Sequence, residues 1–399
     1  MKIRLSIAIL LVCFLFQTTI FAKDLSMNQI VNSSLVFAQK QSLRMAMKYE
    51  KQNLLLPRSF EHNKMTVSNA KWWTSGFFPG TLWYLYENSK NDSLLKYAKM
   101  YTSRIEGEKY TTDNHDIGFM LFCSFGNGYR LLGDANYKST LLQGAKSLST
   151  RFSPKVGLIR SWDFNKELWQ YPVIIDNMMN LELLMWAGKT SNNPEFTKIA
   201  ISHANKTMVN HYRKDMSCYH LVSYDTITGK AAIKQTNQGC SDESAWARGQ
   251  SWGLYGFTMM YRFTHDKRYL EQATKIANFL INHPRMPKDI IPYWDYDAPK
   301  IPDSPRDASS AAIMASALIE LSGFVDAQLG NKYMSIAEKQ IRAMSSPAYT
   351  ARLGENGDFI LKHSVGNIPA KSEIDTPLTY ADYYYVEALL RWKKKSETK

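Results

Sequence analysis

Apolar residues recur every three to four positions along most of the chain after residue 26, which is the period of an amphipathic α-helix. Helix-stop signals separate these stretches, for example at Gly133, Pro194, Pro284 and Pro347. The pattern predicts twelve helices, over residues 27–52, 76–89, 92–107, 115–133, 134–150, 173–189, 194–212, 243–264, 266–282, 305–325, 330–345 and 377–395.

Short and long connections alternate between these helices, as expected for helical hairpins. Six hairpins closed into a ring form an (α/α)6 barrel, and we predict this all-α fold; an open α-helical superhelix is the alternative. Gly249, Gly253 and Gly256 favour close helix packing. An interior glycine costs a helix about 1 kcal/mol relative to alanine, and the close approach of a neighbouring helix offsets that cost.

Strand-like alternation is confined to short pieces, residues 156–162 and 219–224, the second followed by a turn at Thr228-Gly229. Three long connections, residues 213–242, 284–304 and 347–376, are expected to lie on one face of the barrel and to form the walls of a cleft. The second is rich in proline and is therefore stiff.

The first 22 residues have the pattern of a secretory signal peptide. Lys2 and Arg4 precede an apolar run from Leu5 to Phe16, which is too short for a membrane span, and Ala22 is a plausible cleavage position. We therefore expect export, to a periplasm, and one domain over residues 23–399. No later stretch is long and apolar enough to be a transmembrane helix.

The formal net charge is +13, and removal of Lys2 and Arg4 with the signal peptide leaves +11. Such an excess favours a polyanionic partner, although a merely basic surface is equally compatible with it. The sequence lacks a compact basic motif for nucleic acid, so an acidic polysaccharide fits better. With 10 Trp, 23 Tyr and 18 Phe, the chain has enough aromatic rings to fill a core and also to stack on sugars.

The three cysteines that follow the predicted signal peptide do not have the spacing of a zinc site. Cys123 lies in an apolar helical stretch and is expected to be a small core residue. Cys218 and Cys240 flank a loop and could pair, which the sequence leaves open.

Two acidic residues stand at predicted helix starts and are followed by apolar helices. Asp176 follows the run Val173-Ile-Ile175 and shares a helix face with Asn180. Apolar neighbours would raise the pKa of its carboxyl by desolvation, which suits an acid/base catalyst. Asp116 is similar and adjoins His115. The two form a possible carboxylate pair. The alternative for Asp176 is an acid at a helix N-terminus that faces the helix dipole, and the alternative for Asp116 is a helix cap.

Two aromatic clusters could complete a sugar site. Arg248 and Trp252 are four residues apart on one helix face, where an Arg can hold a carboxylate beside a ring. The alternative is a salt bridge next to a core Trp. Trp73 belongs to an aromatic turn that leads into a helix, whereas His220 and Gln238 are isolated polar residues on the 213–242 connection.

Eight segments, taken together and in this order, resemble the unsaturated glucuronyl hydrolases, glycoside hydrolase family 88. They span almost all of the chain after the signal peptide: Trp73–Gly80, Asn114–Phe119, Ile175–Asn180, Tyr219-His220, Gln238-Gly239, Trp246–Trp252, Pro305–Ser310 and Ala381–Tyr385. Any one segment would be weak, but the combination is specific. The resemblance implies the same (α/α)6 barrel that the helix pattern predicts independently.

The resemblance implies removal of a 4,5-unsaturated uronic acid from the non-reducing end of an acidic oligosaccharide, by hydration of its C4=C5 vinyl ether. Asp176 matches the acid/base and Asp116 the second required carboxylate. Other matching positions would contact the uronate: Trp73, His115, His220, Gln238, Arg248 and Trp252. No metal or organic cofactor is implied.

The resemblance leaves the aglycone open. Some relatives accept sulfated aglycones through a short Ser/Lys cluster, and the possible counterparts here are Lys362, His363, Ser364 and Lys371, which could equally be ordinary loop residues. A polysaccharide lyase would supply the substrate, from a glycosaminoglycan, ulvan or gellan. The alternatives are an unsaturated rhamnogalacturonyl hydrolase, whose usual paired aspartates are missing around Asn114, a sugar epimerase, and a non-catalytic glycan-binding protein.

Overall fold

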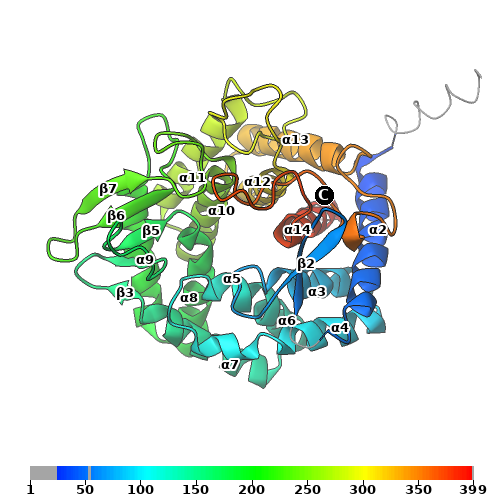
Figure 1. The fold of residues 1–399 in the computed structure, drawn as a ribbon, viewed down its shortest axis with the longest axis horizontal. Coiled ribbons are helices and arrows are strands. Elements are labelled where there is room, and N and C mark those ends of the chain that lie inside the picture. Colours follow the sequence, from blue (N-terminus) through cyan, green and yellow to red (C-terminus); the bar gives the residue numbers. More distant parts are fainter. Residues whose placement is uncertain (1–24, 53–54, 398–399) are drawn as a thin grey trace, which may run out of the picture.

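The computed structural model describes residues 25–52 and 55–397, so the predicted signal peptide lies outside the described residues. Each of the twelve predicted helical segments contains an α-helix. Six lie on the inside of a ring (Figure 1): α3 (Phe77–Ser89), α5 (Ile117–Leu121) with α6 (Asn127–Leu132), α8 (Asn177–Ser191), α10 (Ala247–Thr264), α12 (Ala308–Leu321) and α14 (Thr379–Glu397).

Each inner helix packs against an outer helix that is its neighbour in sequence, except that α14 pairs with the first helix. The outer helices are α2 (Met27–Lys48), α4 (Asp92–Ser103), α7 (Ala135–Ser149), α9 (Pro194–Asn210), α11 (Lys267–Asn282) and α13 (Ala327–Met344). Because α14 contacts both α2 and α3, the ring is closed. The fold is therefore the predicted (α/α)6 barrel, and the open superhelix is excluded.

Burial distinguishes the two layers. Nearly every residue of α12 is buried, and most of them are small, whereas α11 and α13 bury one face and expose the other. A helix that is apolar all round belongs inside, and an amphipathic one belongs at the surface. The glycines of α10 allow the inner helices to pack closely. A Cβ on Gly256, for example, would lie 2.5 Å from the Cβ of Met178 on α8.

Several predicted helix limits were wrong for local reasons. The helix expected over 115–133 is interrupted by a π-helical turn, η2 (Phe122–Gly126), between α5 and α6. The helix expected from residue 173 begins at Asn177, because the β-branched run before Asp176 forms a strand instead. The first helix ends at Lys48 rather than at residue 52.

In addition to the helical ring, the described residues form three small antiparallel sheets. Strands β5 (Pro172–Ile174), β6 (Leu221–Tyr224) and β7 (Ala231–Gln235) form one sheet, in which Val173 pairs with Val222. The predicted strand near 219–224 and the turn at Gly229, with φ of 71°, are confirmed. Strands β3 (Phe152–Ser153) and β4 (Leu158–Ile159) pair as well. The hairpin of β1 (Leu56–Glu61) and β2 (Lys64–Ser68) was not predicted.

The long connections attach to the N-terminal ends of the inner helices. Trp246, which precedes α10, bridges to Asp295 in the 284–304 connection, and Arg248 of α10 binds the backbone of the 347–376 connection at Val365. Cys123, Cys218 and Cys240 are free thiols, so the possible 218–240 pair does not form. Among the described residues, no helix is long and apolar enough to cross a membrane.

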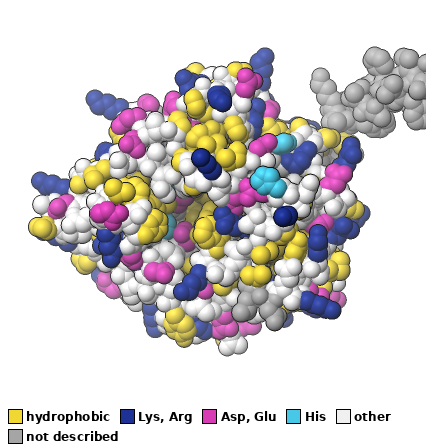
Figure 2. All heavy atoms as spheres, viewed as in Figure 1, with side chains coloured by type: hydrophobic (Ala, Val, Ile, Leu, Met, Phe, Trp, Pro, Cys, Tyr) yellow, Lys and Arg dark blue, Asp and Glu magenta, His cyan; other side chains and the backbone are white. Residues whose placement is uncertain are grey.

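On the face shown in Figure 2, lysine and arginine side chains are scattered and interspersed with acidic ones rather than gathered into one basic patch. The positive net charge of the chain is therefore spread out on this face. Such a surface favours anionic ligands only weakly at any one point.

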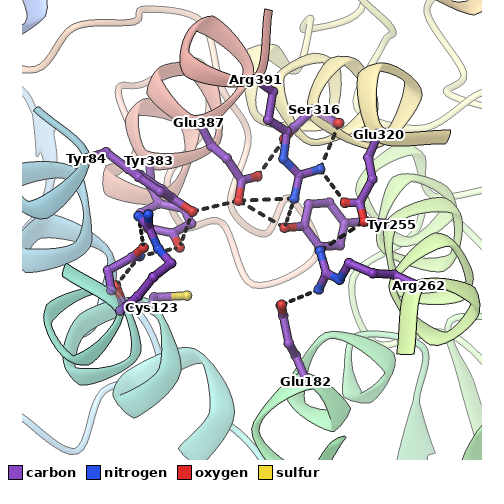
Figure 3. A network of polar contacts seen from close by, with 12 residues as sticks. Tyr84, Cys123, Glu182, Tyr255, Arg262, Ser316, Glu320, Tyr383, Glu387 and Arg391 are labelled. Carbon is purple, nitrogen blue, oxygen red and sulfur yellow. Dashed lines mark hydrogen bonds and ion pairs between the residues drawn. The ribbon is translucent and has the colours of Figure 1, made fainter. Parts of the chain in front are cut away.

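A buried polar network joins the inner helices toward their C-terminal ends (Figure 3). Glu387 of α14 accepts hydrogen bonds from Tyr84 of α3 at 2.7 Å, Tyr255 of α10 at 3.0 Å and Ser316 of α12 at 2.5 Å. Arg391, one turn further along α14, donates to the Tyr255 hydroxyl at 2.8 Å. One carboxylate thus ties four inner helices together.

Two arginines extend this network. Arg262 of α10 forms ion pairs with Glu182 of α8 and, at 2.9 Å, with Glu320 of α12. Arg391 binds the other oxygen of Glu320 at 2.7 Å. Cations near helix C-terminal ends also interact favourably with the helix dipoles. The network therefore holds the inner helices together near their C-terminal ends.

Substitution of Gly256 by alanine should destabilise the fold, although alanine is the better helix former. The new methyl group would collide with Met178, and overpacking costs about 1–3 kcal/mol, which exceeds the gain of about 1 kcal/mol in helix propensity. We expect a lower free energy of unfolding in urea. Gly107→Ala is the matched control, because a Cβ there meets nothing within 4 Å, and it should be neutral or slightly stabilising.

Candidate active site

The inner helices all run in the same direction, because outer helices antiparallel to them alternate with them along the chain, from α2 at the start to α13 before α14. Their N-terminal ends therefore meet at one end of the ring. Most of the residues singled out from the sequence lie at or just before these N-terminal ends: Trp73 before α3, Asp116 before α5, Asp176 before α8, and Arg248 and Trp252 in the first turns of α10.

Asp176 is a buried carboxyl that does not serve as a helix cap. It occupies the N-cap position of α8, but its side chain makes no capping hydrogen bond. Its Oδ2 atom is buried and accepts no hydrogen bond of normal geometry from any described residue. Burial raises the pKa of Asp176 to about 6, against the opposing effects of the Arg248 charge and the Trp252 indole. The expected effect of the apolar surroundings is confirmed.

Asp116 lies in the electrostatic field of Asp176. It occupies the N-cap position of α5, again without a capping side chain. Burial and the neighbouring Asp176 carboxylate raise its pKa to about 8, and the Asn180 amide opposes this rise only in part. Two carboxyls that repel each other in a poorly solvated site retain a proton between them near neutral pH. Helix capping is thus not the role of either residue.

Asn180 connects the helices that carry the two acids. Its Oδ1 atom accepts a hydrogen bond from the backbone N–H of Phe119 at 2.7 Å. A Cβ on Gly118 would lie 2.6 Å from the Cα of Asn180, so only glycine permits this close approach of α5 and α8. Close packing of the two helix starts brings the carboxyls together.

A neutral histidine lies beside each aspartate. His220 accepts a hydrogen bond from the Asn237 backbone N–H at Nδ1, at 2.9 Å, so its proton is on Nε2, which lies 3.7 Å from Oδ2 of Asp176. His115 Nε2 lies 3.4 Å from Oδ1 of Asp116. Burial lowers the pKa of each histidine to about 3, so both act as dipoles rather than charges.

Arg248 is a buried cation, with 1% of its surface exposed. Its Nη1 donates to the carbonyl of Val365 and its Nη2 to that of Gly366 at 2.8 Å. The guanidinium lies over the Trp246 ring, 4.4 Å from its centroid. Gln238 reaches the same Gly366 carbonyl at 3.4 Å, which connects it to the site through the backbone.

The two tryptophans differ in accessibility. Trp252 is fully buried between Phe119 and Tyr384, with ring centroids 5.2 and 5.3 Å away, so only its indole edge faces Asp176. Trp73 is half-buried and packs on Tyr380, with centroids 4.9 Å apart. Trp73 is therefore the ring with surface left for contact with a ligand.

The four residues considered for a sulfate subsite do not converge. Lys362 donates to the Pro347 carbonyl at 2.8 Å, and His363 pairs with Asp375 at 2.7 Å. Ser364 is fully buried. Lys371 is exposed on the turn closed by the Asn367–Ser372 bridge, a few residues beyond Gly366.

The structure adds site residues to which the sequence reasoning gave no role. Asp307, the N-cap of α12, lies 3.6 Å from Arg248, and Tyr380 of α14 faces the same guanidinium at 5.2 Å. Asp307 lies within, and Tyr380 directly before, a segment that carries the family resemblance. That resemblance was the signal in the sequence that could have identified them. Among the described residues, no group of three or more His, Cys, Asp or Glu side chains is arranged to hold a metal ion.

Taken together, the site offers a partly protonated carboxyl pair, two neutral imidazoles, a buried guanidinium and an aromatic ring. This set can donate a proton, receive one back and hold an anion. It is suited to acid/base chemistry on an acidic sugar.

The chain matches the family model described as Glycosyl Hydrolase Family 88 over residues 47–398. An unsaturated glucuronyl hydrolase of Formosa agariphila is 47% identical over 324 residues, which are 81% of this chain and 80% of that protein. An unsaturated chondroitin disaccharide hydrolase of Streptococcus pneumoniae is 30% identical over 88% of this chain and 89% of its own length.

Comparison with solved structures points to the same family. The crystal structure of an unsaturated glucuronyl hydrolase specific for heparin superposes with a TM-score of 0.90 at 51% identity, over 93% of this chain and 98% of that one. The corresponding enzyme from a Bacillus species, responsible for glycosaminoglycan degradation, gives a TM-score of 0.84 at 29% identity, over 93% and 97% of the two chains. The chain therefore belongs to glycosyl hydrolase family 88, and its enzyme class is that of the unsaturated glucuronyl hydrolases.

Proposed function

We propose that Asp176 is the acid/base of a hydration reaction on the unsaturated uronate, and that Asp116 is the second required carboxylate. The observation that carries this proposal is the buried Oδ2 of Asp176, which accepts no normal hydrogen bond from the described residues and belongs to a carboxyl with a pKa raised to about 6. A proton held there near neutral pH is available for transfer.

In the proposed reaction Asp176 gives its proton to C4 of the C4=C5 double bond. The positive charge that develops at C5 is shared with the ring oxygen. Water adds to C5 and returns a proton to Asp176, which restores the catalyst. The C5 hemiketal then opens to a ketone, and the hemiacetal left at C1 releases the aglycone as an alcohol. One water is consumed for each sugar released.

The other residues bind and orient the sugar in this proposal. Arg248 attracts the uronate carboxylate, which its buried positive charge favours. Trp73 offers its accessible ring face to the sugar, and His220 points Nε2–H at Asp176. His115, Gln238 and Trp252 complete the wall around the two carboxyls.

The substrate class we propose is the unsaturated disaccharide left by a lyase that cleaves a glycosaminoglycan, with heparin-type fragments first. Support comes from the heparin-specific relative at 51% identity. The net charge of +11 after residue 22 is consistent with an acidic oligosaccharide. We also propose that residues 1–22 direct export to a periplasm, on the sequence pattern alone.

Asp176→Asn should greatly reduce turnover but preserve binding. Loss of a general acid lowers the rate by about a hundredfold to ten-thousandfold. The assay is loss of the ultraviolet absorbance of the conjugated double bond, with disaccharide affinity measured by calorimetry. Undiminished turnover would contradict the assignment.

Thermal unfolding at neutral pH distinguishes chemistry from misfolding in this variant. The folded-state pKa of Asp176 is raised to about 6, so the wild type loses stability as pH rises from the unfolded-state value of about 3.9 through the folded value. Removal of the carboxyl abolishes this penalty. Asp176→Asn should therefore be at least as stable as the wild type at pH 7.

The pH profile of kcat/KM should fall on its alkaline side. The reaction needs protonated Asp176, and the carboxyl pair loses its protons in two steps near the pKa values of about 6 and about 8. We expect the rate to be highest below pH 6 and to decline above it, measured with one disaccharide at constant ionic strength. A rate that rises through this range would mean that the ionised pair is the active form.

Lys371→Ala should reduce kcat/KM for sulfated disaccharides more than for unsulfated ones. Lys371 is the exposed cation on the turn that follows the Gly366 carbonyl bound by Arg248. An exposed charge contributes modestly, so we expect a change of about two- to fivefold. Lys332→Ala, an exposed lysine on outer helix α13, is the control and should affect neither substrate. Equal loss on both substrates would remove Lys371 from the aglycone site.

A further inference from the structure

Arg248 has one carboxylate neighbour. Its guanidinium donates hydrogen bonds to the uncharged carbonyls of Val365 and Gly366. Among the described residues, Asp307 is the single carboxylate within ion-pair distance, with Oδ2 at 3.6 Å from Nη1. An isolated buried cation is costly, so the Asp307 charge matters for how Arg248 is held.

Asp307 is itself rigidly held. It is fully buried, and its Oδ1 accepts hydrogen bonds from the Ser309 backbone N–H at 3.0 Å, the Ser309 hydroxyl at 2.6 Å and the Val365 backbone N–H at 3.3 Å. Its own N–H donates to the Pro292 carbonyl at 2.9 Å. Burial raises the pKa of the Asp307 carboxyl, whereas the Arg248 charge and these donors oppose the rise because they favour the charged form. Asp307 therefore ties α12 to the 284–304 and 347–376 connections and faces Arg248 of α10.

The charge of Arg248 acts on the catalytic acid. It opposes the rise in the pKa of Asp176, and it also lowers the pKa of His220. An opposite charge placed next to the guanidinium reduces this effect at Asp176. Asp307 is in that position, on the side of Arg248 formed by α12 and the Val365–Gly366 backbone.

We propose that Asp307 is a positioning residue, which fixes Arg248 against the Val365–Gly366 backbone and balances its charge, so that Asp176 keeps its proton into the neutral range. The proposal deepens the function given above and rests on it. It gives a role to the Pro305–Ser310 segment, which the reaction scheme alone leaves unused.

Few other groups can change the local charge. The Asp176 carboxylate raises the pKa of Asp116, so the two carboxyls titrate as a pair. The remaining titratable neighbours are neutral near pH 7, because burial lowers the pKa of the histidines and raises that of the thiol and the phenols: His115, His220, Cys218, Tyr296 and Tyr380. The charges around Asp176 are therefore those of Arg248, Asp307 and the carboxyl pair. Arg151 adds a further positive charge, which lowers the pKa of Asp116 and His115.

The test is the titration of the Asp176 carboxyl, followed by NMR in full-length protein labelled with ¹³C at the aspartate carboxyls. The Asp176 signal is assigned by its absence from Asp176→Asn. Asp307→Asn keeps an acceptor for the α12 cap but removes the charge. We expect the midpoint of Asp176 to fall by about one pH unit. The alkaline limb of kcat/KM should move by the same amount, which is about a tenfold loss of rate above it.

Asp382→Asn is the matched control. Asp382 is also a buried carboxyl, and it accepts the backbone N–H groups of Ile360 at 2.8 Å and Leu361 at 2.9 Å. It forms no ion pair with Arg248, so its loss tests the effect of a buried carboxyl that binds the backbone, without the Arg248–Asp307 pair. The Asp176 midpoint should not move in this variant.

A double-substitution cycle tests the route through Arg248. Arg248→Gln alone should raise the Asp176 midpoint, and addition of Asp307→Asn to it should change that midpoint little. The double variant buries neither charge, so it remains informative if Asp307→Asn alone does not fold.

An unmoved Asp176 midpoint in Asp307→Asn, or an undiminished shift in the Arg248→Gln background, would overturn the proposal and leave Asp307 as a helix cap. Failure of the wild type to consume unsaturated disaccharides would instead contradict the proposed function. The carboxyl titration needs no turnover, so the two failures are distinguishable.

Discussion

The common direction of the six inner helices is the constraint on which the site depends. Antiparallel outer helices alternate with the inner ones along the chain, so all the N-terminal ends of the inner helices meet at one end of the closed ring. Asp116, Asp176, Arg248 and Asp307 come from four different helices and meet because those helices start there. The helix dipoles make this end favourable for an anionic sugar. Burial nevertheless outweighs the dipoles at both aspartates, since the pKa of each is raised, and repulsion from Asp176 adds to the rise at Asp116.

The opposite end of the ring, where the inner helices end, holds the helices together. There Glu387, Arg391, Arg262 and Glu320 satisfy one another's hydrogen-bonding groups across the inner helices (Figure 3). A carboxylate shared by three hydroxyl donors fixes the spacing of α3, α10, α12 and α14. The helices are thereby held at their finishing ends, and the starting ends can keep buried polar atoms, such as Oδ2 of Asp176, without a protein partner.

Much of the fold could be predicted because helix periodicity is a local signal, and Gly249, Gly253 and Gly256 indicated the close packing correctly. The π-helical turn at Phe122–Gly126 and the β1–β2 hairpin depend on tertiary contacts and left no periodic trace. In the site, Asp116 and Asp176 could be found from helix starts, but their electrostatic coupling could not. Asp307 does cap its helix, and that local role hid its ion pair with a residue far away in sequence. Lys362, His363 and Lys371 looked like a cluster, yet positive φ values of 59° at His363 and 53° at Lys371 turn the chain between them.

The neutral histidines decide which group can carry the proton. His220 is fixed by the Asn237 N–H with its own proton aimed at Asp176, and a pKa of about 3 keeps it uncharged at any pH where the site works. It cannot compete as an acid, because its Nε2–H stays in place and stabilises the carboxylate that remains after proton transfer. His115 likewise lies next to Asp116, with Nε2 at 3.4 Å from Oδ1, and burial keeps it neutral. Both imidazoles are thus dipoles rather than acids. In the proposed reaction, this leaves the carboxyl pair to carry the proton given to carbon and the proton taken from water.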